Sequence, residues 1–206
     1  LRSAATEAVL EAVSGGATYA SHAYLPHGIS GMATTAFEIF EQLGEAPGSV
    51  VTPVGQGSMF LGLALGFQAL ARARQIDRLP QLIPVQALAC APIWSDYLSA
   101  EAKEQSVLEG ETIAEGIRIL NPLRRESVIA AIRESGGVAI AVEEEEIHSG
   151  LRMLGRRGLY VEPTSAVVWP GVEKSWDQIQ DPVVAILTGN GLKSGFHNDR
   201  KIVMEE

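Results

Sequence analysis

One stretch of the chain, residues 49–74, limits the possible folds more than any other. It opens with the β-branched run 50–54, which predicts a buried strand. The sequence Gly-Gln-Gly-Ser at residues 55–58 predicts a tight turn, and residues 59–74 predict a helix that is apolar nearly all round at its start. Glycines let the backbone approach an oxyanion, and the first amides of a helix lack internal partners while its dipole favours negative charge. The stretch therefore predicts either an anion site, with phosphate as the expected guest, or a turn that serves packing alone.

Two common nucleotide-binding motifs do not fit this stretch. No Gly-Lys-Ser/Thr follows the turn, so it is not a P-loop. Gly55, Gly57 and Gly62 are spaced G-x-G-x-x-x-x-G, which is a poor match to the dinucleotide fingerprint. Asp77 follows the helix directly and not a second strand, so it is not placed to hold a ribose.

Composition and charge limit the expected partners. The chain has 206 residues, which suits one domain with its own core, and a net charge of −9, which argues against nucleic acid and anionic membranes. Its longest apolar run is too short to span a bilayer, and no charged-then-apolar leader opens it. The single cysteine, Cys90, cannot form an internal disulfide, which fits a reducing compartment. We therefore expect a cytoplasmic location.

Strand and helix patterns alternate along the chain. Helices are predicted at residues 3–13, 31–43, 59–74, 91–104, 124–134, 143–157 and 162–174. Strands are predicted at residues 17–20, 50–54, 82–88, 138–142 and 182–187, with residues 21–30 as a loop and 106–119 as an irregular segment. Pro84 argues for an edge or strand-end position, whereas the apolar run 182–187 predicts a buried strand. The alternation predicts one α/β domain over residues 1–206, with an open, mostly parallel sheet and helices on both faces.

Ligands on such sheets bind beyond the carboxyl ends of the strands. Two predicted strands end in small, glycine-rich turns, where Val54 leads into Gly55 and Leu187 leads into Thr188. These two turns are the candidate sites.

The remaining polar residues give weaker signals. The acidic run 143–146 resembles a metal cluster, but it fits better as a solvated helix N-terminus. The histidines His22, His27, His148 and His197 are not at ligand spacing, so we expect no metal, and His22 and His27 either face a substrate or lie on a surface loop. Glu162 is either a buried acid near the site or the first turn of a helix. None of the lysines (Lys103, Lys174, Lys193, Lys201) lies in the apolar context that a nucleophilic lysine needs.

Five segments in their order and spacing resemble the fold-type II pyridoxal-phosphate enzymes, most closely the threonine synthase branch. They are Gly-Met-Ala-Thr-Thr-Ala-Phe-Glu-Ile at 31–39, Pro-Val-Gly-Gln-Gly-Ser at 53–58, Pro-Val-Gln-Ala at 84–87 with Ala-Pro-Ile at 91–93, Val-Glu-Pro-Thr-Ser-Ala at 161–166, and Leu-Thr-Gly-Asn-Gly-Leu-Lys at 187–193. The chain departs from the family in having Ser30-Gly31 where Glu-Gly is expected, Ala33-Thr34 where Lys-Thr is expected, and Gln56 where Asn is more usual. These departures leave the exact substrate open.

The resemblance implies a cofactor, pyridoxal 5'-phosphate, and a set of residues that bind it. The turn formed by Gly55, Gln56, Gly57, Ser58 and Met59 is implied to bind the cofactor phosphate, and Thr188 to face the pyridine nitrogen. The family's Schiff-base lysine lies in an N-terminal Ser-Phe-Lys-type segment that this sequence does not contain. The chain therefore resembles the C-terminal, large-domain part of such an enzyme, and we expect it to be inactive alone.

The resemblance also implies a lyase reaction, in which O-phosphohomoserine and water give threonine and phosphate, and a homodimer for the complete enzyme. A neutral hydroxyl at the pyridine nitrogen would not hold that nitrogen protonated, which suits elimination and replacement better than transamination. Two alternatives stay open. One is a threonine or serine dehydratase, although residues 91–93 and 188–193 favour the threonine synthase branch. The other is a non-catalytic binding domain.

Overall fold

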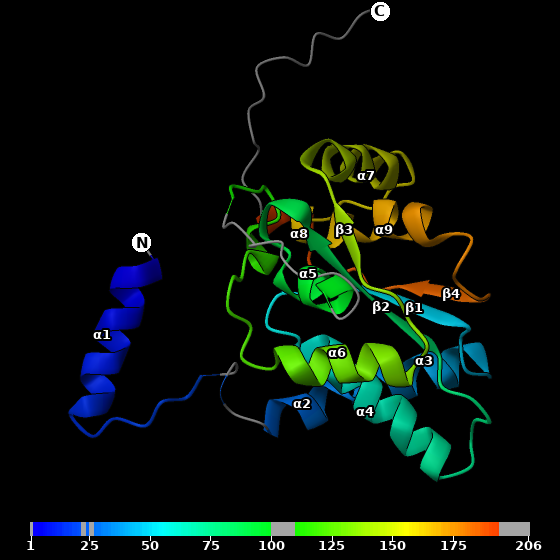
Figure 1. Cartoon of the computed structure of the whole chain (residues 1–206), viewed down its shortest axis with the longest axis horizontal. Coiled ribbons are helices and arrows are strands. Elements are labelled where there is room, and N and C mark those ends of the chain that lie inside the picture. The colour runs from blue at the N-terminus through cyan, green and yellow to red at the C-terminus, as the bar shows by residue number, and fades with distance from the viewer. Residues whose placement is uncertain (1, 22–23, 25–26, 100–109, 194–206) are drawn as a thin grey trace, which may run out of the picture.

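Four parallel strands form one sheet at the centre of the computed structural model, which describes residues 2–21, 24, 27–99 and 110–193 (Figure 1). The strands are β1 (Ser49–Pro53), β2 (Gln81–Ala87), β3 (Ile140–Val142) and β4 (Val183–Ala185). Their order in the sheet is β3-β2-β1-β4, and β1 pairs in parallel with both β2 and β4. The predicted parallel α/β sheet is therefore confirmed.

Helices cover both faces of this sheet (Figure 1). The α-helices are α1 (Arg2–Ser14), α2 (His27–Met32), α3 (Thr34–Leu43), α4 (Ser58–Arg72), α5 (Pro92–Ser99), α6 (Arg125–Glu134), α7 (Glu144–Arg156), α8 (Pro163–Ala166) and α9 (Val168–Ser175). Short 3₁₀ turns lie at Leu88–Cys90, Glu115–Ile117 and Gly191–Lys193. Helices α4 and α6 lie on one side of the sheet and α7 and α9 on the other, whereas α1 stands away from it (Figure 1).

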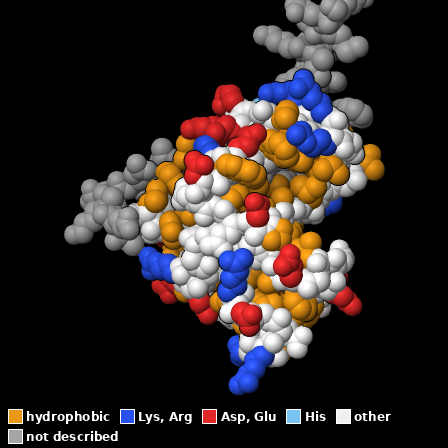
Figure 2. Space-filling model, turned by 90° about the vertical axis from the view of Figure 1, so that its right-hand side faces the viewer, with side chains coloured by type: hydrophobic (Ala, Val, Ile, Leu, Met, Phe, Trp, Pro, Cys, Tyr) orange, Lys and Arg blue, Asp and Glu red, His pale blue; other side chains and the backbone are white. Residues whose placement is uncertain are grey.

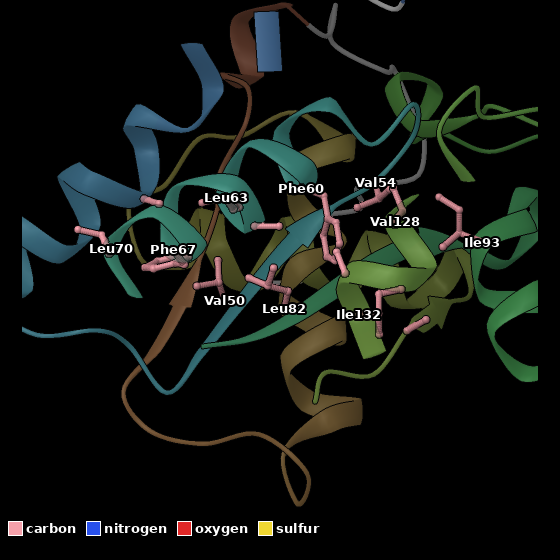
Figure 3. Packing of buried hydrophobic residues seen from close by; sticks show 14 of the residues in the cluster. Val50, Val54, Phe60, Leu63, Phe67, Leu70, Leu82, Ile93, Val128 and Ile132 are labelled. Carbon is pink, nitrogen blue, oxygen red and sulfur yellow. The ribbon is translucent and has the colours of Figure 1, made fainter. Parts of the chain in front are cut away.

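Two apolar clusters, one on each face, hold the layers together. Successive strand residues point to opposite faces, so Val50 belongs to the cluster under α4 and Val51 to the cluster under α7 to α9. Figure 3 shows Phe60 and Phe67 of α4 pointing toward Val50 and Leu82 of the sheet. Burial on both faces explains why the central strands are apolar without alternation.

Helix α4 is buried between the sheet and two other helices, which explains why it is apolar nearly all round. A Cβ at Gly62 would collide with Met32 at the end of α2. A Cβ at Gly66 would lie 2.5 Å from the Ala33 carbonyl oxygen. The two glycines therefore let α2 and α3 pack directly on the α4 backbone.

Several predicted elements need correction near the N-terminus. Residues 17–20 form no strand, and the predicted loop 21–30 gives way to α2 at His27. Helix α3 starts at Thr34, later than predicted, and ends at Gly44, whose φ of 75° and hydrogen bond to the Phe40 carbonyl stop the helix as expected. The predicted helix 91–104 is observed as α5 up to Ser99, and residues 100–109 lie outside the described part of the chain.

Pro84 does not place its strand at an edge, because β2 lies between β1 and β3. The Val85 carbonyl faces β1, where it accepts from the Val54 N–H. Successive residues of a strand direct their backbone groups to opposite sides, so the nitrogen of Pro84 faces β3. Pairing with β3 begins only at Val85. The missing N–H of Pro84 therefore costs no ladder hydrogen bond.

Two predictions in the C-terminal half also change. The predicted helix 162–174 is broken into α8 and α9 at Val167, because Pro170 has no N–H to donate to the carbonyl of Ala166. The strand predicted as buried at 182–187 is β4, an edge strand whose residues are half-buried to exposed. Its apolar run is typical of a central strand, but β4 has a neighbouring strand, β1, along one edge only.

Acidic and basic side chains are interspersed with apolar ones on the face drawn in Figure 2. Basic side chains gather near the upper end of that face, beside a group of acidic ones.

Candidate functional site

The turn after β1 lies too close to its neighbours for side chains at two positions. A Cβ on Gly55 would lie 3.1 Å from the Ile117 Cα and 3.2 Å from the Gly116 carbonyl oxygen. Gly57 has a φ of 88°, and a Cβ there would lie 2.6 Å from the Val128 Cγ2. Conformation and space therefore both require glycine at residue 57.

Helix α4 begins at this turn without a side-chain cap, since its N-cap residue is Gly57. The first intrahelical hydrogen bond runs from the Leu61 N–H to the Gly57 carbonyl (2.9 Å), so the N–H groups of Ser58, Met59 and Phe60 have no acceptor within the helix. The Ser58 Oγ is buried and has no hydrogen-bond partner among the described residues. These donors, together with the positive end of the helix dipole, form an arrangement suited to an anion.

The loop after β4 is fixed against the start of α8. Ser165 of α8 is fully buried, and its Oγ accepts a hydrogen bond of 2.7 Å from the Gly189 N–H. The same Oγ lies 3.2 Å from the Oγ1 of Thr188. The Glu162 N–H donates to the Gly189 carbonyl (3.1 Å), so the loop is held at both polar groups of Gly189.

Because β1 and β4 are neighbours in the sheet, the loops that follow them meet at one strand-end cavity of about 230 Å³. The residues in its wall are Pro53, Gly55, Gln56, Gly57, Ser58, Met59, Phe60, Gly116, Ile117, Thr164 and Thr188. All six residues predicted from the sequence, Gly55 to Met59 and Thr188, are among them. None of these wall residues is charged, so an anion here would be held by amides, hydroxyls and the helix dipole.

Within this wall, Gln56 has a structural contact of its own. Its Oε1 accepts a hydrogen bond of 3.1 Å from the Leu123 N–H. The side chain thus ties the glycine turn to the segment that leads into α6.

The opposite side of the cavity was not predicted from the sequence. Gly116 and Ile117 come from the segment expected to be irregular. Thr164 comes from residues 161–166, which resemble the family but indicated no role in the site. The Thr164 Oγ1 accepts from the Gly116 N–H (3.1 Å), which joins the two pieces. The Pro-Thr-Ser sequence at the start of α8 is the feature from which this side of the cavity could have been predicted.

The remaining polar candidates that the structure describes lie outside the cavity wall. His27 is the first residue of α2, and His148 lies in α7. His22, His197, Lys103 and Lys201 lie outside the described residues. The Lys174 Nζ is 2.7 Å from the Glu146 Oε2, and the Lys193 Nζ is 3.9 Å from the Glu162 Oε2, so both described lysines point to carboxylates.

Glu162 lies at the start of α8, as the helix alternative predicts, and it is half-buried and outside the cavity wall. It is the N-cap residue of α8, and its side chain, 20% exposed, packs against Gly189 beside Thr188. The acidic run 143–146 is confirmed as a helix N-terminus, where Glu143 and Glu146 form a capping box. In residues 2–21, 24, 27–99 and 110–193, no group of three or more His, Cys, Asp or Glu side chains is placed to hold a metal ion. No helix in the same part of the chain is long and apolar enough to cross a membrane.

Sequence comparison identifies relatives over most of the chain. Residues 2–189 match the family described as "Pyridoxal-phosphate dependent enzyme". Threonine synthase of Synechocystis is 36% identical over 171 residues, and threonine synthase of Methanocaldococcus jannaschii is 35% identical over 174 residues. Each alignment covers 82% of this chain but 43% of the relative, so the chain spans less than half the length of these curated relatives.

Solved structures support the same fold. A threonine deaminase from T.th. superposes with a TM-score of 0.62 at 24% identity, covering 79% of this chain and 56% of that one. Maize serine racemase gives a TM-score of 0.59 at 21% identity, covering 79% and 48% of the two chains. With a family match over nearly the whole length and relatives above 30% identity, this chain belongs to the pyridoxal-phosphate-dependent enzymes.

Proposed function

We propose that the chain contributes the cofactor-binding part of a threonine synthase, which converts O-phosphohomoserine and water to threonine and phosphate. The observation that carries this proposal is the strand-end cavity. The uncapped start of α4 and Thr188 both line it, at the positions that the resemblance assigns to the two ends of the cofactor. The identity of about 35% to threonine synthases supports this branch of the family.

The cofactor phosphate is proposed to bind at the glycine turn. Donors come from the amides of Ser58 and Met59, which have no acceptor within the helix, and from the Ser58 Oγ, which has no partner among the described residues. Gly57 keeps the backbone open to an oxyanion. A buried hydroxyl without a protein partner is costly unless a ligand satisfies it. The cavity residues therefore fit a phosphate ester.

Thr188 is proposed to contact the pyridine nitrogen at the other end of the cavity. Bound pyridoxal phosphate supplies the electron sink of the reaction. The hydroxyl of Thr188 is neutral, so it orients the ring without stabilising a positive charge on the nitrogen. That property suits replacement and elimination better than transamination.

We further propose that the lysine that holds the cofactor aldehyde lies outside the described residues. Lys174 and Lys193 pair with carboxylates, and neither is in the cavity wall. The curated relatives are more than twice as long as the aligned region, so the proposed activity is that of the full-length protein, and the 206-residue chain alone is expected to be inactive. We also propose that these 206 residues act as a single large-domain unit of the enzyme and that the full-length protein is a homodimer, which light scattering would test.

The test is an assay of two reactions on the 206-residue chain and on the full-length gene product. The full-length protein with pyridoxal phosphate should release threonine and phosphate from O-phosphohomoserine. Release of 2-oxobutanoate and ammonia from threonine, without the first activity, would identify a dehydratase instead. No turnover of either substrate by the full-length protein would favour a non-catalytic domain.

Lysine labelling tests the second part of the proposal. Borohydride reduction in the presence of pyridoxal phosphate attaches the cofactor to the lysine that holds it, and peptide mapping then locates that lysine. The isolated chain should show no single stoichiometric site. Specific labelling of any one of the four lysines of this chain, Lys103, Lys174, Lys193 or Lys201, would overturn the expectation that the chain alone lacks the lysine that holds the cofactor.

A further inference from the structure

Ser165 has more hydrogen-bonding neighbours than its single hydroxyl proton can serve. The side chain is completely buried, and its Oγ accepts from the Gly189 N–H at 2.7 Å. The Thr188 Oγ1 and the Gly189 carbonyl oxygen both lie 3.2 Å from the same Oγ. A serine hydroxyl has one proton, so it donates to only one of these two oxygens at a time.

The surroundings of Gly189 favour donation to Thr188. The Gly189 carbonyl already accepts from the Glu162 N–H at 3.1 Å. A backbone N–H can only donate, so the Gly189 amide fixes one end of the chain of hydrogen bonds. The Ser165 Oγ is within donating distance of the Gly189 carbonyl, whereas its contact with Thr188 can run in either direction. When the Ser165 proton goes to Thr188, donation runs from Gly189 to Ser165 and from Ser165 to Thr188.

We propose that Ser165 is a positioning residue that makes Thr188 a hydrogen-bond donor toward the cofactor ring. When Ser165 donates to the Thr188 Oγ1, the proton of Thr188 is free to point into the strand-end cavity. A pyridine nitrogen facing that proton accepts it in a hydrogen bond and stays unprotonated. This inference rests on the proposed function, because it takes the ring nitrogen as the partner of Thr188.

The loop keeps its place without the Ser165 hydroxyl, which makes the proposal testable by substitution. The Glu162 N–H holds the Gly189 carbonyl, and the Gly191 N–H donates to the Tyr160 carbonyl at 3.0 Å. Val161 and Asn190 form an antiparallel bridge between the same two segments. Ser165→Ala should therefore remove the directed proton while leaving the backbone clamp.

The experiment follows the ring nitrogen directly, by NMR of the full-length protein loaded with pyridoxal phosphate isotope-labelled at that nitrogen. The wild-type signal should be that of an unprotonated nitrogen throughout the neutral pH range. In Ser165→Ala the Thr188 hydroxyl is free to accept, so the signal should shift toward the protonated position as the pH falls. The affinity for the cofactor should fall about two- to tenfold, as expected for one lost hydrogen bond.

Ser175→Ala provides the matched control. Ser175 is also fully buried, but its Oγ donates to the Gly171 carbonyl at 2.7 Å within α9, and it is not in the cavity wall. This variant should leave the nitrogen signal unchanged. Ser165→Cys, which keeps a weaker donor of similar size, should give a signal between those of the wild type and Ser165→Ala.

A second readout needs no cofactor. The Gly189 amide of the unloaded protein should exchange its hydrogen faster in Ser165→Ala than in the wild type, because its acceptor is gone. Unchanged exchange would contradict the hydrogen bond on which the proposal depends.

The outcomes separate this inference from the proposed function. A nitrogen signal that responds to Thr188→Val but not to Ser165→Ala would overturn the role of Ser165 alone. A protonated nitrogen in the wild type would overturn the direction of the hydrogen bonds. A signal that responds to neither substitution, or a protein that does not bind the cofactor, would overturn the proposed contact of Thr188 and this inference with it.

Discussion

The carboxamide nitrogen of Gln86 donates a hydrogen bond of 3.2 Å to the carbonyl oxygen of Val54, the residue that joins β1 to the glycine turn. The same carboxamide accepts from the Ile93 N–H (2.9 Å) and the Trp94 N–H (3.1 Å) in the first turn of α5. Gln86 is 1% exposed, so water cannot replace these bonds. One buried side chain thus connects the end of β2, the start of α5 and the proposed phosphate site.

Gln86→Leu should lower the free energy of unfolding by about 3 kcal/mol, because it leaves buried backbone groups without partners. Urea denaturation followed by circular dichroism would measure the change. Gln75→Leu is the control, since Gln75 is exposed, and it should change stability by less than about 0.5 kcal/mol. Equal effects of the two substitutions would show that the Gln86 bonds contribute little.

Ser58→Ala should change stability and cofactor binding in opposite directions. Without cofactor, removing a buried hydroxyl that has no partner in the described part of the chain should stabilise the protein by about 1 kcal/mol. With cofactor, loss of a donor to a charged phosphate should weaken binding about 10- to 100-fold. Thermal unfolding of the unloaded protein and fluorescence titration with pyridoxal phosphate would measure the two effects. Equal affinity of wild type and variant would remove Ser58 from the phosphate site.

Gly57→Ala should distort the turn, because φ is 88° and the new Cβ would meet Val128. The left-handed conformation alone costs about 1–2 kcal/mol for a residue with a side chain. We expect cofactor affinity to fall at least about tenfold, since a shift of the turn displaces the amides of α4. The double variant Gly57→Ala/Val128→Ala removes the collision but keeps the unfavourable φ. Because Val128 is fully buried, its truncation has a cost of its own, so the comparison needs the single variant Val128→Ala as well. Gly57→Ala should cost less stability in the Val128→Ala background than in the wild type, and an equal cost would mean that the collision is unimportant.

Three substitutions at Thr188 test its proposed contact with the ring nitrogen. Thr188→Ser keeps the hydroxyl and should keep most activity of the full-length enzyme. Thr188→Val removes it at nearly constant volume and should cost about 1–3 kcal/mol. Thr188→Asp should favour a protonated nitrogen, shift the cofactor absorption and promote transamination. Absorption spectra and turnover rates that match the wild type in both the Val and Asp variants would remove Thr188 from the site.

The sequence predicted the central part of the fold because its signals there are local. The β-branched run of β1, the glycines of the turn and the apolar start of α4 follow one another without interruption. Burial on both faces makes the strands apolar on both faces, so the layered arrangement also follows from the pattern. The strand ends then indicated both loops of the cavity.

Other features depend on neighbours that lie far away in the sequence. The run 182–187 is as apolar as a central strand, and only the strand order shows that β4 lies at the edge. Ser165 and Thr188 are 23 residues apart, and no periodicity predicts that their hydroxyls meet. Whether the Ser58 hydroxyl has a partner is likewise decided by packing and not by the residue type.

The pairing of β1 with β4 has a consequence for folding. The two strands come from opposite halves of the chain, so their parallel contact closes a long loop and carries a large entropic cost. A cofactor that touches the turn after β1 and the loop after β4 binds only when this pairing is present, so it stabilises the paired state by mass action. Bound pyridoxal phosphate would then stabilise the contact between β1 and β4. After loss of the cofactor, β4 should separate from β1 before the rest of the protein unfolds.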